Sequence, residues 1–135
     1  MTDTTKTLLD RLDCQEVMNR YAASIDLRDW ARLATVFVDG PIEAVRQTIT
    51  GFDATQHFFA NHSVELRGDQ ATDLRYMQAR HQMDAAHYTI GGYYTSEMVR
   101  TAAGWRIARY RLTVTFSDGE RRLMGLAYRR ATGRL

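Results

Sequence analysis

Apolar residues recur every three or four positions through the first third of the chain, which is the spacing of a helix that buries one face. The repeat predicts a long amphipathic helix over residues 7–25, whose apolar stripe consists of Leu8, Leu9, Leu12, Val17, Met18, Tyr21, Ala22 and Ile25. Asp29 can cap a short second helix that carries Trp30, Leu33, Ala34 and Phe37. A third helix is expected over residues 41–49, because Pro41 suits a first helical position and Gly51 suits a helix end.

The pattern changes near His57 to an alternation of apolar and polar residues, which is typical of strands with one buried face. It predicts four strands, over residues 57–66, 71–82, 88–100 and 105–116. A last short strand is expected over residues 123–128, before an arginine-rich tail. Gly91 and Gly92 lie inside a predicted strand, where they indicate a bend or bulge that curves the sheet.

Helices that precede a run of hairpin-linked strands are typical of an α+β domain. We expect a cone-shaped roll, in which the N-terminal helices pack on a curved, mainly antiparallel sheet. Residues 1–135 contain no internal repeat or linker, so they are predicted to form a single domain. A cone of this kind leaves a cavity at its mouth, where helix and sheet side chains converge.

Composition excludes several classes of protein. The 135 residues are 44% apolar and 25% charged, as in an ordinary globular domain. Cys14 is the only cysteine, so no intramolecular disulfide can form. The N-terminus lacks the features of a signal peptide, and no stretch approaches the ~20 apolar residues of a membrane span. We therefore expect a cytoplasmic protein with no membrane partner.

The positive charge does not predict a nucleic-acid partner. The net charge is +2, and 17 of the 18 basic residues are arginines. These arginines are spread through strand-like segments and form no single basic block. No zinc-finger, helix-turn-helix or single-strand-binding signature accompanies them, so nucleic-acid binding is not expected.

Asp26 is the first candidate for chemistry, because its helical phase is unusual for a surface residue. It lies four residues after Ala22 and eight after Met18, at the edge of the predicted buried stripe. A carboxylate at such a place is costly unless it has a partner. The alternative is that Asp26 caps the second helix or binds nearby backbone amides.

The four histidines are His57, His62, His81 and His87. Their spacings match no short metal-ligand motif, so no metal is expected. A single histidine in a strand is more often packed or exposed than functional. A carboxylate beside a histidine, however, fixes the tautomer and makes the other ring nitrogen a general base. If Asp26 meets His57 in this way, His81 can act as an acid or orient a leaving oxygen.

Four segments together resemble a known family: residues 21–33 (YAASIDLRDWARL), 51–58 (GFDATQHF), 92–95 (GYYT) and 104–108 (GWRIA). They resemble the SnoaL-like branch of the nuclear transport factor 2-like superfamily, and within it are similar to scytalone dehydratase and hexachlorocyclohexane dehydrochlorinase. The resemblance implies a cone-shaped α+β fold and a lyase without a cofactor. It identifies Asp26 as the dyad aspartate, His57 as the base and His81 as the second histidine.

The sequence departs from that family pattern at two places. Ile25 stands where scytalone dehydratase has a tyrosine before the aspartate. Asp26 and His57 are 31 positions apart, which is a shorter interval than family members generally have. The missing stretch would supply strand and lid material beside the pocket, so an open or rebuilt pocket is expected.

The leading hypothesis is a cofactor-independent dehydratase, related lyase or isomerase that acts on a small apolar cyclic molecule. The candidate pocket wall consists of Tyr21, Trp30, Tyr76, Tyr94 and Phe116. One alternative is a non-catalytic module of the same fold that binds a small ligand or mediates oligomerisation. Another is a polyketide cyclase-like or epoxide-hydrolysing enzyme. Sheets of this type commonly pack face to face, so a homodimer or homotrimer is also predicted.

Overall fold

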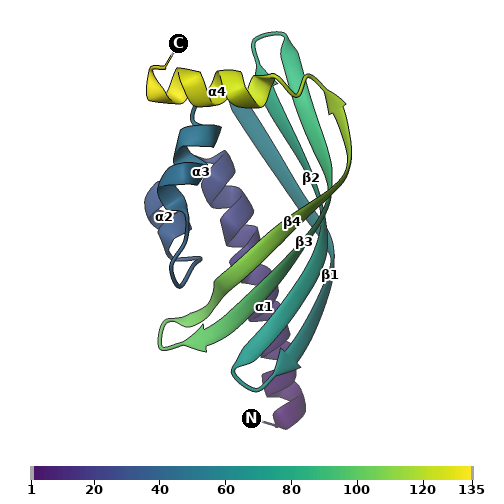
Figure 1. Cartoon of the computed structure of the whole chain (residues 1–135). Coiled ribbons are helices and arrows are strands. Elements are labelled where there is room, and N and C mark those ends of the chain that lie inside the picture. Colours follow the sequence, from purple (N-terminus) through teal and green to yellow (C-terminus); the bar gives the residue numbers. More distant parts are fainter. Residues whose placement is uncertain (1, 135) are drawn as a thin grey trace.

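The computed structural model describes residues 2–134. Three helices come first, four long strands follow and a helix ends the chain (Figure 1). The elements are α1 (Asp3–Asp26), α2 (Trp30–Ala34), α3 (Ile42–Ile49), β1 (Ala54–Arg67), β2 (Gln70–Met83), β3 (Ala86–Thr101), β4 (Gly104–Gly119) and α4 (Leu123–Thr132).

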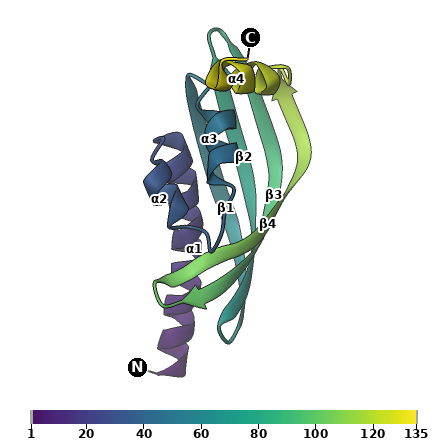
Figure 2. The same cartoon turned by 60° about the vertical axis from the view of Figure 1, so that its left-hand side comes forward.

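The four strands form one curved antiparallel sheet in the order β1-β2-β3-β4, so every strand pairs with its neighbours in sequence. The helices lie on one side of this sheet, with α1 running along it and α4 crossing its end (Figures 1 and 2). This confirms the predicted α+β architecture of N-terminal helices packed on a curved antiparallel sheet. The concave face is the side covered by helices, and the convex face is open.

The main core fills the space between α1 and the concave face. Its buried side chains from α1 include Val17, Met18, Tyr21 and Ile25. On β2 the buried residues are the odd-numbered ones, from Ala71 to Met83, as expected for a strand with one covered face. This phase decides which side chains of β2 can reach the concave side.

The prediction of a strand over residues 123–128 is wrong, because this segment belongs to α4. Leu123 and Ala127 are buried and lie four residues apart, which is helical spacing. Gly133, in the left-handed conformation, ends the helix. A Cβ at Gly51 would overlap the backbone of Ala127, so a glycine is needed where α3 ends against α4.

A polar clamp fixes α1 to the β3–β4 hairpin, far along the helix from Asp26. The guanidinium of Arg100 donates two hydrogen bonds of 2.8 Å to the carboxylate of Asp10 and one of 2.9 Å to Asp69. The indole of Trp105 donates to the same Asp10 carboxylate at 3.1 Å. The hydrogen bond from Arg100 is the main reason why the pKa of Asp10 lies below its ordinary value.

The short interval between Asp26 and His57 contains α2, one isolated bridge and α3. Phe37, predicted to lie in the second helix, instead forms a parallel bridge with Ile107 on β4. Within residues 2–134, this bridge is the only pairing on the outer edge of β4. The side chains of residues 114–119 on β4 are exposed.

Candidate functional site

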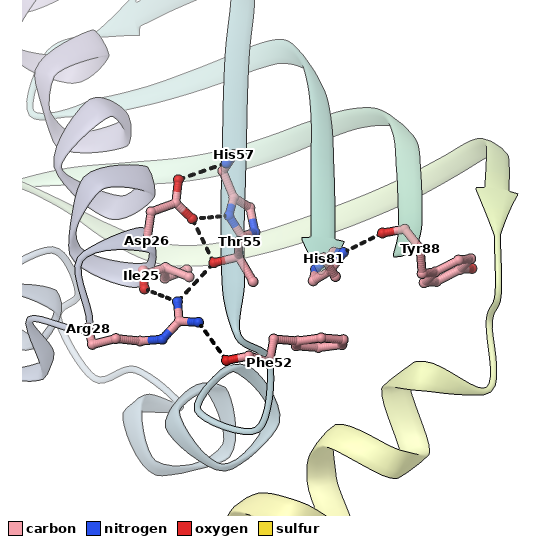
Figure 3. A network of polar contacts seen from close by, with 8 residues as sticks. All are labelled: Ile25, Asp26, Arg28, Phe52, Thr55, His57, His81 and Tyr88. Carbon is pink, nitrogen blue, oxygen red and sulfur yellow. Dashed lines mark hydrogen bonds and ion pairs between the residues drawn. The ribbon is translucent and has the colours of Figure 1, made fainter. Parts of the chain in front are cut away.

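The structure brings Asp26 and His57 together at the C-terminal end of α1 (Figure 3). His57 Nδ1 lies 2.7 Å from Asp26 Oδ1, and the backbone N–H of His57 donates to Asp26 Oδ2 at 2.7 Å. Both oxygens of one carboxylate therefore hold the same residue. Since the carboxylate can only accept when ionised, the Nδ1 atom carries the proton and Nε2 is the basic nitrogen.

Two residues that the sequence analysis did not single out complete this network. The hydroxyl of Thr55 donates to Asp26 Oδ1 at 2.9 Å and accepts from Arg28 Nη1 at 2.9 Å. Arg28 also donates to the carbonyl oxygens of Ile25, at 3.0 Å, and Phe52, at 3.3 Å. Because the Thr55 oxygen accepts a hydrogen bond from the Arg28 guanidinium, the proton of the Thr55 hydroxyl points to the Asp26 carboxylate.

Arg28 offsets an unfavourable position of Asp26. A carboxylate at a helix C-terminus faces the negative end of the helix dipole. Arg28, in the left-handed conformation with φ 59° just past the helix, turns its guanidinium back onto the last-turn carbonyl of Ile25. Burial lowers the pKa of Arg28, and the nearby Asp26 charge acts in the opposite direction. The residue thus caps the helix and supports the carboxylate through Thr55.

Asp26 is held in its ionised form. Burial alone would raise the pKa of this carboxyl, but hydrogen bonds from the His57 ring, the His57 backbone and Thr55 outweigh burial and lower it. The side chain of Asp26 keeps only a fifth of its surface exposed and that of His57 about a twentieth (20% and 6%). This arrangement suits a carboxylate that orients a base and stabilises the cation formed on it.

His81 faces His57 from β2, with 5.8 Å between the ring centroids and an angle of 82° between the rings. Its Nδ1 atom lies 3.0 Å from the backbone carbonyl oxygen of Tyr88. Burial lowers the pKa of His81, more than the hydrogen bond to Tyr88 raises it. His81 is therefore neutral at neutral pH.

Both histidines line a cavity of about 300 Å³ between α3 and the concave face of the sheet. Two of the predicted wall residues, Tyr21 and Tyr94, also line it, with ring centroids 6.0 Å apart. The rest of the lining is mostly apolar and consists of Ile25, Pro41, Ala44, Val45, Thr48, Ile49, Met77, Ala79, Ile90, Tyr110, Leu112 and Met124.

Three predicted wall residues lie elsewhere. Trp30 is partly buried and packs against the main core, but it does not line the cavity. Tyr76 and Phe116 are on the convex face, where they border a separate hollow of about 680 Å³. Tyr76 belongs to the even-numbered residues of β2, which point away from His81. The prediction that these three residues line the candidate pocket is therefore wrong.

The remaining histidines and the cysteine are outside the cavity as well. His62 lies 3.5 Å from the buried carboxylate of Asp73, and His87 pairs with the exposed Asp118 at 3.1 Å. Cys14 is buried in the main core, and burial raises the pKa of its thiol to about 12. A thiol of this kind is not a nucleophile at neutral pH.

Tyr110 is a further pocket residue that the sequence analysis missed. Its ring lies 5.9 Å from that of Tyr21 and 5.7 Å from that of Tyr94, so three phenols from α1, β3 and β4 meet in the lining. Burial is the main reason why the pKa of each phenol lies above its ordinary value. A signal was present in the sequence, since Tyr110 and Leu112 share one strand face by alternation.

Two wider properties of the described chain bear on the site. Within residues 2–134, no three histidine, cysteine or acidic side chains gather in a group that could hold a metal ion. None of the helices in this part of the chain combines the length and apolar character needed to cross a membrane.

Comparison with known proteins places this fold in a family. The family model described as the SnoaL-like domain matches residues 38–111. No curated protein sequence matches the chain. The solved Kfla4162 protein from Kribbella flavida is 27% identical with a TM-score of 0.80, and the match covers 90% of this chain and 98% of that one.

Two further solved structures share the fold at lower identity. A type 2 hexachlorocyclohexane dehydrochlorinase (LinA) is 15% identical with a TM-score of 0.80, covering 87% of this chain and 93% of its own. A scytalone dehydratase-like protein from Novosphingobium aromaticivorans is 20% identical with a TM-score of 0.73, covering 89% and 92%. Because the family model spans more than half of the chain, this protein belongs to the SnoaL-like domain family and has the nuclear transport factor 2-like fold.

Proposed function

We propose that this protein is a cofactor-independent lyase or isomerase that works by general acid–base catalysis on a small, apolar, cyclic molecule. The observation that carries the proposal is the Asp26–His57 pair, whose histidine lines a largely apolar cavity. His57 is the base, Asp26 orients it, and His81 contacts the substrate from the neighbouring strand β2. The names of the solved relatives, a dehydrochlorinase and a scytalone dehydratase-like protein, support elimination as the reaction class.

The geometry suits proton abstraction from carbon. His57 Nε2 takes a proton from a carbon beside a carbonyl or a leaving group, and the resulting imidazolium donates Nδ1–H to the ionised Asp26. The imidazolium then returns the proton, either to the departing group in a lyase or to another carbon in an isomerase. A largely apolar cavity favours such a step, because charge interactions are stronger where water is excluded.

The volume and lining of the cavity support the substrate class. At about 300 Å³ it is large enough for a molecule with one or two rings, and its apolar lining would stabilise such a ring by burial. Tyr21 and Tyr94 offer flat ring faces beside the base. Catalysis needs only groups of the chain itself.

The test is a panel of cyclic hydroxy-carbonyl and halogenated compounds, followed by absorbance or mass spectrometry for loss of water or halide. We expect one or more to be turned over, with kcat reduced by about 10²–10⁴ in His57→Gln. His87→Gln is the matched control, because that histidine lies outside the cavity. Full activity in a folded His57→Gln variant would exclude the proposed mechanism.

The convex face supports a second proposal, self-association through the sheet. Phe58, Tyr76 and Phe116 are 63%, 55% and 51% exposed there and border the hollow of about 680 Å³. A contiguous exposed apolar surface of this kind is typical of a protein interface. We expect sedimentation to give a dimer or trimer, and Tyr76→Lys to give a monomer, while Gln70→Lys on the same strand has no effect. A wild-type protein that sediments only as a monomer would refute this.

A further inference from the structure

The outer edge of β4 is open over most of its length. β4 is the last strand in the sheet order, and its only pairing on the outer side within residues 2–134 is the bridge between Phe37 and Ile107. There Ile107 exchanges backbone hydrogen bonds of 2.8 and 2.9 Å with the residues that flank Phe37. The chain then turns away into α3, and Figure 2 shows no further strand beside β4. Along residues 109–119 the outer row of backbone donors and acceptors therefore has no strand partner in the described chain.

Two bulges define the part of this edge that can pair regularly. The register between β3 and β4 shifts twice, which leaves Ala108 and Thr115 as extra residues on β4. Between them, residues 109–114 pair with β3 without interruption. A stretch of this kind is about 20 Å long, which is the usual length of a strand. The open edge can therefore accept one further strand of ordinary length beside residues 109–114.

The convex face of this stretch carries positive charge that the chain does not fully balance. Arg109 lies opposite Glu97 on β3 and pairs with it at 2.8 Å. Arg111, two residues further on and on the same exposed face, lies opposite Thr95 and has no ion-pair partner within residues 2–134. Both arginines border a hollow of about 360 Å³. Side chains of an added strand on this face would therefore lie beside an unbalanced positive charge.

The concave face of the same stretch is apolar. Tyr110 and Leu112 alternate with the two arginines, are half-buried and face Pro41 and Val45 across the cavity lining. A strand added beside residues 109–114 would place its side chains alternately on the two faces of the sheet. Apolar side chains suit the face of Tyr110 and Leu112, and acidic side chains suit the face of the arginines.

From this pattern we infer that the edge of β4 binds an extended segment of another protein, in which acidic and apolar residues alternate. In this mode of recognition, main-chain hydrogen bonds to the sheet edge supply affinity and the alternate side chains supply specificity. A second copy of this chain fits less well, because pairing residues 109–114 of two copies would bring their arginines together. The inference goes beyond the proposed function and does not depend on it.

The first test is an NMR titration of the ¹⁵N-labelled wild-type protein with a synthetic peptide, in which aspartate and valine alternate over about eight residues. We expect the amide resonances of residues 109–114 to shift and their hydrogen exchange to slow. The control peptide alternates lysine and valine and should not bind. Equal binding of the two peptides, or shifts confined to other surfaces, would overturn the inference. Slow exchange of residues 109–114 before any peptide is added would also overturn it, because a second copy would then cover the edge.

The second test reverses the charge on the edge. In Arg111→Glu the affinity for the aspartate peptide should fall about fivefold, because an exposed attraction becomes a repulsion, and the lysine peptide should bind better than it does to the wild type. Arg129→Glu makes the same change of net charge on α4 and should leave both affinities unchanged. Equal losses in the two variants would show that only the net charge matters and would overturn the inference. Both arginines are exposed, so both variants should fold.

Discussion

Replacing Thr55 by valine removes a single hydroxyl from the support of the Asp26–His57 pair and keeps the shape of the side chain. In the structure, that hydroxyl lies 2.9 Å from Asp26 Oδ1 and 2.9 Å from Arg28 Nη1. Asp26 thus loses one of its three hydrogen bonds, and Arg28 loses one of three acceptors. Both partners are charged, and the methyl group that replaces the oxygen can form a hydrogen bond with neither of them.

The expected cost follows from the charge and burial of the partners. A hydrogen bond to a charged group contributes about 1.5–3 kcal/mol, and partial exposure of Asp26 and Arg28 reduces the loss because water can replace the hydroxyl. We expect Thr55→Val to lower the free energy of unfolding by about 2 kcal/mol. For a domain of this size that corresponds to a fall of about 7 °C in Tm. Thr55→Ser keeps the hydroxyl and should lose less than half as much.

The effect should also depend on pH, in a direction fixed by Asp26. The folded-state pKa of Asp26 is lowered, so its stabilisation is fully present above the unfolded value of 3.8 and is lost as pH falls through the folded pKa. The difference in Tm between wild type and Thr55→Val should therefore shrink in acid. Scanning calorimetry of the three proteins at neutral and acid pH measures both effects. Equal stability of the valine and serine variants at neutral pH would refute the role assigned to the hydroxyl.

Three further perturbations test other parts of the structure. Gly92→Ala should cost about 1–3 kcal/mol in urea unfolding, because a Cβ there would overlap the backbone carbonyl oxygen of Thr113; an unchanged midpoint would contradict this close approach. Asp10→Asn should destabilise the protein by about 1–2 kcal/mol by weakening the charge-assisted bonds from Arg100. Because the pKa of Asp10 is lowered when folded, this loss should be present above pH 3.8 and fade below it, and a loss that persists in acid would point to packing instead. Cys14 should resist thiol reagents at pH 8 in the native protein and react after denaturation, and rapid native labelling would contradict its burial.

Periodicity was sufficient to predict the long elements of this fold. The alternation after His57 extends over enough residues for the covered face of β2 to be identified. On α1 the predicted buried stripe is correct for Val17, Met18, Tyr21 and Ile25 and wrong for Leu8, Leu9 and Leu12, which are exposed because the first turns of the helix extend beyond the main core. The same alternation excludes Tyr76 from the pocket, since it is five residues from His81 and thus on the other face of β2. The segment 123–128 is shorter than two helical turns, so the alternation of a strand and the spacing of a helix could not be distinguished in it.

Phe116 could not be placed from the sequence alone, because a bulge changes the phase of β4. Tyr110 and Leu112 face the cavity, and regular alternation would put Phe116 beside them. The pairing shifts between Gly91 and Gly92, however, which leaves one extra residue on β4 and turns Phe116 to the convex face opposite Gly91. The glycines indicated a bend, but not which strand gains the residue.

The support of the site was beyond pattern analysis for a different reason. Arg28 lies in a turn and Thr55 at the start of a strand, where neither periodicity nor a motif assigns a role. Their contact joins residues 27 positions apart and depends on a long side chain that folds back over the end of α1. Only the relative placement of α1 and β1 shows that the guanidinium of Arg28 donates to the hydroxyl of Thr55, which in turn donates to the carboxylate of Asp26.

The sequential order of the strands has a consequence for how the protein reaches its native state. Each strand pairs with the one before it, so the sheet can assemble from hairpins whose ends are close in the chain, which favours rapid folding. The docking of α1 is different, because Asp10 must find Arg100 across 90 positions. Asp26 reaches His57 only when this helix docks, so the formation of the Asp26–His57 contact during refolding would report on the slow, long-range step and not on the formation of the sheet.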